Sequence, residues 1–129
     1  MKGVNGRVAL VTGAGSADGI GFATAKLLRE AGAKVAITST TDRIYDRLKE
    51  LGGEKNMSFA KPADLTHSDE VQALIEDISA SLGPIDILVN NAGMVQIGKQ
   101  DSAGQLSNMS DESWSYGMEI NLTSAFYVT

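Results

Sequence analysis

Short apolar runs alternate along the chain with longer stretches in which apolar residues recur at helical spacing. The runs contain little polar alternation, which predicts strands that are buried on both faces, at residues 7–12, 34–38, 57–61 and 85–89. Strands that alternate with helices are typical of a parallel sheet with crossover helices. The sequence therefore predicts an α/β fold built on a four-stranded parallel sheet.

The stretches between the runs predict amphipathic helices. The first is expected to bury a face made of Ile20, Ala23, Leu27 and Ala31. Residues 39–42 can cap a charged helix that ends near Leu51. Residues 66–69 have the spacing of a capping box, which predicts the start of a third helix. Its apolar stripe consists of Val71, Leu74, Ile75, Ile78 and Leu82. The stretch from Met94 to Ser110 predicts a loop over a site, and Ser110, followed by Asp111 and Glu112, is expected to begin a final helix.

Length and composition limit what the chain can do. The 129 residues suffice for one domain, residues 1–129, and 43% of them are hydrophobic, which is enough for a core. Eleven basic against sixteen acidic residues give a net charge of −5, so no nucleic-acid partner is expected. Without cysteine and with His67 as the single histidine, we expect no metal site. No run is long enough for a signal peptide or a membrane span, which predicts a cytoplasmic protein.

A glycine-rich turn, Thr12–Gly21, lies between the first predicted strand and the first predicted helix. Glycines at this position bring backbone N–H groups to a pyrophosphate at the positive end of the helix. The alternative is a turn that only lets the helix pack closely. A P-loop is excluded because Gly19 is followed by Ile20 rather than by a lysine. The turn predicts a dinucleotide site that includes Gly13, Gly15, Ser16, Asp18, Gly19 and Ile20.

Together with Asp64–Leu65, Asn90–Gly93 and Asn121, this turn resembles the short-chain dehydrogenase/reductase family, and most of all its 3-oxoacyl-acyl-carrier-protein reductase branch. The resemblance extends from about Gly6 to Thr129. It implies a Rossmann-type doubly wound parallel sheet with strand order 3-2-1-4. It also implies reduction of a ketone or 3-oxoacyl thioester with a nicotinamide cofactor. The turn of this chain differs from the family pattern because it has two additional residues between its outer glycines.

The segment after the second strand decides between NAD and NADP. A carboxylate there binds the ribose hydroxyls, whereas its absence beside a basic residue accommodates a 2′-phosphate. Ser39, Thr40 and Arg43 offer hydroxyls and a guanidinium, and Asp42 comes too late to be the ribose carboxylate. We therefore predict NADP, with NAD the less favoured cofactor. The alternative is that these residues only cap the next helix.

The resemblance implies roles for the motifs after the third and fourth strands. Asp64 is implied to hydrogen-bond the adenine, with the backbone of Leu65 beside it; the alternative is a turn aspartate. Asn91, Ala92 and Gly93 are implied to line the nicotinamide ribose, while the asparagine also ties strands together. Because parallel strands end at one edge of the sheet, we expect these motifs to lie close to the glycine turn.

Asn121 is the candidate catalytic residue. With Trp114, Met118 and Ala125 it recurs at helical spacing, which predicts an amide on a buried apolar face. A buried amide is costly unless its groups are paired, so one interpretation is a structural residue that its neighbours satisfy. The resemblance implies the other, in which Asn121 holds a water on the proton relay to a catalytic lysine.

The resemblance implies a catalytic serine and a Tyr-x-x-x-Lys pair in a segment that would follow the last helix of this chain. Residues 45–49 fit the latter pattern but fall on the helix after the second strand, away from the nicotinamide end. We therefore expect an N-terminal, cofactor-binding part of a reductase, inactive alone; the alternative is a non-catalytic nucleotide-binding or interaction module. The run Ile85–Val89 would form an apolar sheet edge, which predicts a homo-oligomer or completion by a further segment.

Overall fold

The computed structural model describes residues 2–93 and 106–129. In this part of the chain, four strands form one parallel sheet in the order β3-β2-β1-β4. The strands are β1 (Val8–Val11), β2 (Lys34–Ile37), β3 (Ser58–Ala60) and β4 (Ile87–Val89). Leu10 of β1 lies in register with Ala36 of β2 and Leu88 of β4. The four predicted strands, the parallel sheet and the 3-2-1-4 order are confirmed.

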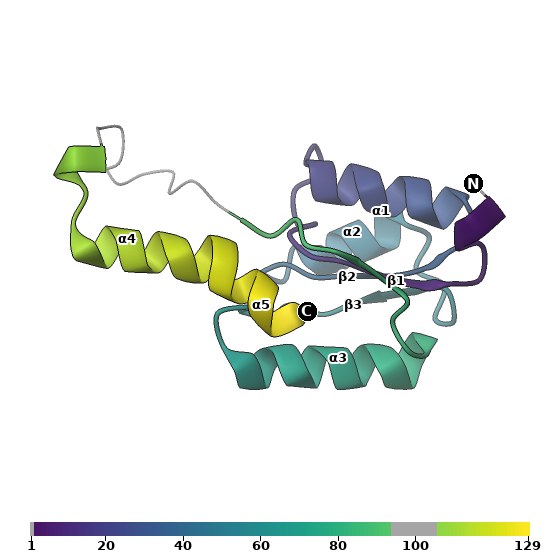
Figure 1. Cartoon of the computed structure of the whole chain (residues 1–129). Coiled ribbons are helices and arrows are strands. Elements are labelled where there is room, and N and C mark those ends of the chain that lie inside the picture. The colour runs from purple at the N-terminus through teal and green to yellow at the C-terminus, as the bar shows by residue number, and fades with distance from the viewer. Residues whose placement is uncertain (1, 94–105) are drawn as a thin grey trace.

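Helices cover both faces of the sheet. The helices α1 (Ile20–Glu30) and α2 (Ile44–Glu50) lie on one face, and α3 (Ser68–Leu82) lies on the other (Figure 1). Most of the predicted loop, residues 94–105, lies outside the described residues. Among the helices that are described, none has the length and apolar character needed to cross a membrane.

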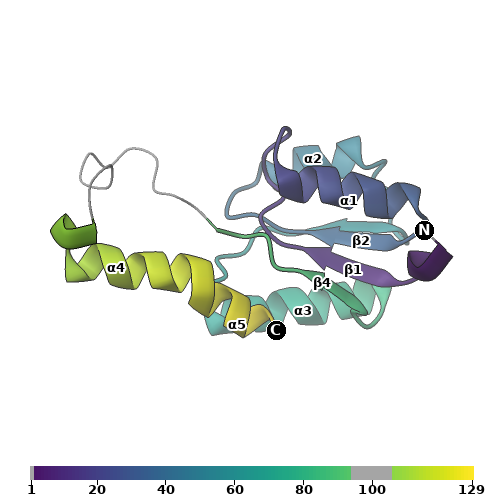
Figure 2. The same ribbon diagram turned by 45° about the horizontal axis from the view of Figure 1, so that its top comes forward.

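The last part of the chain is a helical arm. A 3-10 turn, η3 (Leu106–Asn108), precedes α4 (Asp111–Met118), and a π-helical turn, η4 (Glu119–Thr123), joins α4 to α5 (Ser124–Val128). Figure 2 shows α4 extending away from the sheet while α5 lies beside α3. At the other end of the chain, a short 3-10 turn, η1 (Lys2–Val4), precedes β1.

Side chains of the two central strands fill two cores, one on each face of the sheet. All four residues of β1 are buried, as a run without polar alternation predicts. Because successive strand residues point to opposite faces, Leu10 packs with the apolar residues of α3, and Val11 packs with those of α1. The sheet between these cores is a rigid base for the loops at its carboxyl edge.

The buried face of α1 differs from the predicted one. Ile20 and Leu27 are 79% and 62% exposed, and Ala23 is exposed as well. The face that packs on the sheet consists of Gly21, Phe22, Ala25 and Leu28. The prediction placed the face about one residue out of register, because it gave no weight to Gly21, which packs directly against Gly13 and thereby turns Phe22, Ala25 and Leu28 toward the sheet.

Helix starts agree with the predictions in one case and differ in two. The helix α2 begins after Arg43 without a side-chain cap. The N-cap of α3 is His67, also without a cap bond, because the Thr66 hydroxyl donates to Asp64 instead. At α4 the expected cap is present, since the Ser110 hydroxyl accepts a hydrogen bond from a backbone N–H of the first turn.

Candidate cofactor-binding site

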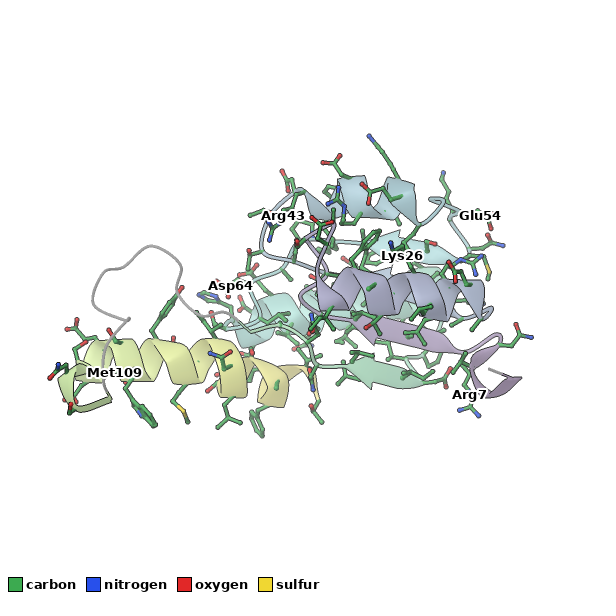
Figure 3. All side chains as sticks on the ribbon, turned by 90° about the horizontal axis from the view of Figure 1, so that it is seen from above. Arg7, Lys26, Arg43, Glu54, Asp64 and Met109 are labelled. Atoms are coloured by element: carbon green, nitrogen blue, oxygen red, sulfur yellow. The ribbon has the colours of Figure 1, made fainter. Side chains whose placement is uncertain are left out.

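The residues predicted for the site gather at the carboxyl ends of the strands. The glycine turn follows β1, residues 39–43 follow β2, Asp64 and Leu65 follow β3, and residues 91–93 follow β4. Figure 3 shows Arg43 and Asp64 at this end of the molecule and Arg7 at the opposite end. Ligands of open parallel sheets bind at this edge, where the strand order reverses.

Thr12 joins the glycine turn to the end of β4. Its buried hydroxyl accepts hydrogen bonds from the N–H groups of Asn91 (3.1 Å) and Ala92 (2.9 Å), and donates to the Val89 carbonyl (3.3 Å). The Asn91 side-chain amide donates in return to the carbonyls of Thr12 (3.2 Å) and Gly13 (3.1 Å). Sequence reasoning missed Thr12, although a hydroxyl at the end of a buried strand requires such partners.

Two glycines of the turn lie where no side chain fits. A Cβ on Gly13, whose φ is +67°, would lie 2.8 Å from the Cα of Ala92. A Cβ on Gly21 would lie 2.5 Å from Nδ2 of Asn91. Gly21 was quoted within the motif but not predicted as a site residue. Both glycines allow the turn, the first helix and the end of β4 to meet without a gap.

Gly15 brings the turn beside the segment after β2. A Cβ at this position would lie 2.7 Å from Nε of Arg43 and 2.9 Å from Oγ of Ser39. The Ala14 N–H also donates to the carbonyl of Thr38, at 3.1 Å. Ser39 is buried and Arg43 is exposed, as is Thr40. A guanidinium and a hydroxyl therefore lie directly beside the turn.

The N-terminus of α1 fits an anion. Gly19 is its N-cap, without a side-chain cap bond, and the first turn contains no acidic residue, whereas the first turns of α3 and α4 each contain two. Ser16, Asp18 and Ile20 are exposed around this end of the helix. Backbone N–H groups and the positive end of the helix dipole stabilise a negative charge, so the backbone at this end of α1 fits the pyrophosphate of a dinucleotide.

Asp64 is held by its own neighbours beyond β3. Thr66 donates its N–H (2.9 Å) and its hydroxyl (2.6 Å) to Oδ1 of Asp64, and Oδ2 lies 3.2 Å from Nδ1 of His67. The Thr66 hydroxyl lowers the pKa of the Asp64 carboxyl below its ordinary value of 3.8. Glu70 completes a group whose ligand atoms lie within 4.8 Å of one another, exposed on the surface, to which we assign no metal. The Leu65 side chain is buried nearby.

Asn121 lies in the π turn η4 rather than in a regular helix. Its Nδ2 donates to the Gly117 carbonyl at 2.9 Å, and a Cβ on Gly93 would lie 2.6 Å from its Oδ1. The structure therefore brings Asn121 to the segment after β4. The predicted buried face is wrong: Asn121 is exposed, and Trp114 and Met118 are 54% and 37% exposed. Trp114 and Met118 precede the π turn and are exposed because α4 extends away from the sheet (Figure 2), and the π turn then changes the helical repeat before Asn121.

The family model described as short chain dehydrogenase matches residues 7–129. The chain belongs to this family. It is 39% identical over 123 residues to the 3-oxoacyl-acyl-carrier-protein reductase FabG of Vibrio cholerae, covering 95% of this chain and 46% of that relative. It is 34% identical to the 5-keto-D-gluconate 5-reductase of Escherichia coli, covering 96% of this chain and 46% of the relative.

Solved structures of short-chain dehydrogenases share the fold. A variant of actinorhodin polyketide ketoreductase with NADPH has a TM-score of 0.82 and 34% identity, over 95% of this chain and 44% of that one. The L-sorbose reductase of Gluconobacter frateurii, complexed with NADPH and L-sorbose, has a TM-score of 0.83 and 28% identity, over 98% of this chain and 46% of that one. The chain thus spans about half the length of the relatives it matches, and the predicted family and Rossmann-type fold are confirmed.

Proposed function

We propose that this chain is the cofactor-binding part of an NADP(H)-dependent reductase that converts a ketone or 3-oxoacyl thioester to the hydroxy compound. The main support is that Ser39 and Arg43 lie against Gly15, beside the N-terminus of α1, which has no side-chain cap. A guanidinium and hydroxyls match a 2′-phosphate, and the helix N-terminus matches a pyrophosphate. The NADPH in two similar structures supports the same class of cofactor.

Each segment at the strand ends binds a different part of the cofactor. The backbone of the turn, from Gly13 to Ile20, binds the pyrophosphate, and Ser39, Thr40 and Arg43 bind the 2′-phosphate of the adenosine ribose. Asp64 accepts a hydrogen bond from the adenine, with the backbone of Leu65 beside the ring. This division follows the order of the strands, because β3 and β2 lie on one side of the turn and β4 on the other.

The end of β4 and the arm form the nicotinamide side of the site. Asn91, Ala92 and Gly93 line the nicotinamide ribose, and the bound nicotinamide supplies hydride chemistry there. Asn121, whose Oδ1 lies beside Gly93, holds a water for proton transfer. Its amide nitrogen already donates to the Gly117 carbonyl, so the amide oxygen is the group that accepts from that water.

Cofactor selectivity tests the 2′-phosphate assignment. Calorimetry on the complete protein is expected to show tighter binding of NADPH than of NADH. Arg43→Glu is expected to weaken NADPH binding by at least about tenfold and to change NADH binding little, because only the phosphate loses its partner. Arg7→Glu, the same charge change at the opposite end of the molecule, is the matched control (Figure 3). A tenfold preference for NADH would refute the NADP assignment, and equal losses for both cofactors would remove Arg43 from the phosphate site.

The role of Asn121 is tested by separating turnover from folding. Asn121→Leu in the complete enzyme is expected to lower kcat strongly and to leave the thermal midpoint within a few degrees, because this side chain is exposed. Steady-state kinetics and thermal melts of the same preparation measure both quantities. Retained activity with a collapsed midpoint would show a structural amide instead.

A further inference from the structure

We propose that Thr66 is a positioning residue that makes the adenine site selective for a purine with a 6-amino group, because it fixes the Asp64 carboxylate in one orientation with Oδ2 left for the base. The proposal rests on the proposed function, in which Asp64 contacts the adenine. It concerns a residue that does not itself touch the cofactor.

Two donors from one residue determine how the carboxylate is oriented. The N–H and the hydroxyl of Thr66 both donate to Oδ1 of Asp64, at 2.9 Å and 2.6 Å. An oxygen that already accepts two hydrogen bonds has used both of its lone pairs, so a further donor must approach Oδ2. The backbone is held as well, since the Asp64 N–H donates to Oε1 of Glu70 at 3.3 Å. The carboxylate therefore presents one defined oxygen.

The neighbouring side chains leave Oδ2 accessible to a ligand. His67 approaches it with Nδ1 at 3.2 Å, and the Asp64 side chain is 45% exposed. Lys61, three residues earlier, pairs with Asp77 of α3 instead of with Asp64. With a proton on Nδ1, His67 donates to one lone pair of Oδ2, and the second lone pair is left for a base. The exposed oxygen of Asp64 is therefore available to a donor from a ligand.

The orientation and ionisation of Asp64 together give chemical selectivity. An ionised carboxylate only accepts hydrogen bonds, so it pairs with the 6-amino group of adenine and faces the 6-keto oxygen of hypoxanthine with a like acceptor. The Thr66 hydroxyl favours the ionised form, as the lowered pKa of Asp64 shows. Without that hydroxyl only the Thr66 N–H still donates to Oδ1, so the carboxylate is held less firmly and the discrimination between the two purines weakens.

The test compares NADPH with its hypoxanthine analogue by calorimetry on the complete protein. The unmodified protein is expected to prefer NADPH by at least about tenfold, the usual effect of one hydrogen bond to a charged group. Thr66→Val should reduce this preference at least threefold. Thr66→Ser, which retains the hydroxyl, should keep the preference of the unmodified protein. Thr24→Val, which removes a hydroxyl that donates to a backbone carbonyl within α1, is the matched control and should leave the preference unchanged.

A second variant keeps the test decisive if Thr66→Val does not fold. In Asp64→Asn, the two Thr66 donors require the amide oxygen at the Oδ1 position, which places the amide N–H₂ where Oδ2 was. This donor suits the 6-keto oxygen, so the preference should shift at least tenfold toward the hypoxanthine analogue. Equal weakening of both cofactors in Asp64→Asn, or an unchanged preference in a folded Thr66→Val, would overturn the role of Thr66.

The proposed function fails in a different way. If the unmodified protein binds both cofactors equally and Asp64→Ala changes neither affinity, Asp64 does not contact the adenine, and both the adenine assignment and the inference are wrong. If Asp64→Ala removes a clear preference that Thr66→Val retains, the adenine assignment stands and only the positioning role of Thr66 is refuted.

Discussion

The sheet body, residues 2–93, buries its large apolar side chains far more than the helical arm, residues 106–129, does. In the body, each residue of β1 is buried, and glycines of the turn contact backbone at distances that exclude a side chain. In the arm, α4 and η4 contain no buried residue. Large apolar side chains are exposed in the arm, namely Met109, Trp114, Tyr116, Met118, Leu122, Phe126 and Tyr127.

The difference shows which region carries the candidate site. Every predicted cofactor residue belongs to the body, and the arm adds Asn121 alone. Several contacts join the arm to the body. Val128 packs into the core that contains the residues of α3, Asn90 donates through Nδ2 to the Thr129 hydroxyl at 3.2 Å, and the Asn121 side chain lies against Gly93. Helices derive most of their stability from tertiary packing, so the body and the arm should respond very differently to the same substitution.

Leucine truncation should give the largest contrast. Leu10→Ala, at a fully buried position of β1, is expected to lower the free energy of unfolding by about 2–5 kcal/mol because it leaves a cavity between strands and α3. Leu122→Ala, at a position that is 58% exposed, should change it by less than about 0.5 kcal/mol. Urea denaturation measures both. A large loss in Leu122→Ala that grows with protein concentration would show that a second copy covers the arm.

Glycine substitution should give a smaller contrast of opposite sign. Gly21→Ala is expected to lower the free energy of unfolding by about 1–3 kcal/mol, because the new Cβ meets Asn91 and the Gly13 carbonyl. Gly117→Ala in α4, where nothing lies within 4 Å, should raise it by about 0.5–1 kcal/mol, since alanine favours the helix. A stable Gly21→Ala with unchanged NADPH binding would contradict the close packing of the turn.

The body was more predictable from the sequence than the arm. Apolar runs without alternation and crossover helices determine the parallel sheet, and the order 3-2-1-4 places the motifs at one edge. The face of α1 was missed because the contact of Gly21 with Gly13, which sets the register of the helix on the sheet, leaves no signal in apolar periodicity. Thr12 was missed because its partners, Asn91 and Ala92, are almost eighty residues away in the chain.

Local hydrogen bonding caused the other differences between prediction and structure. The Thr66 hydroxyl could either cap the N-terminus of α3 or donate to the Asp64 carboxylate. In the structure it donates to Asp64, and the helix has no side-chain cap. In the arm, a regular repeat of 3.6 residues predicted one face for Trp114 and Asn121, but the π turn changes the register between them. Periodicity alone does not reveal a π turn, because the turn depends on what the helix packs against.

The smallest expected effect concerns Asp64 at the rim of the body. Because its pKa is lower in the folded protein than its ordinary value of 3.8, the folded state binds fewer protons, and the ionised carboxylate stabilises the fold above that value. This stabilisation is lost as the pH falls through the folded pKa.

The difference in unfolding free energy between the unmodified protein and Asp64→Asn should therefore be larger at about pH 6 than at about pH 3, measured by urea denaturation. Combining Asp64→Asn with Thr66→Val should add little to that pH dependence, because the Thr66 hydroxyl is the largest cause of the lowered pKa. If the unfolding free energy of Asp64→Asn depends on pH as that of the unmodified protein does, the Asp64 carboxylate does not stabilise the fold. Substitutions at this edge of the body would then affect stability as little as substitutions at exposed positions of the arm.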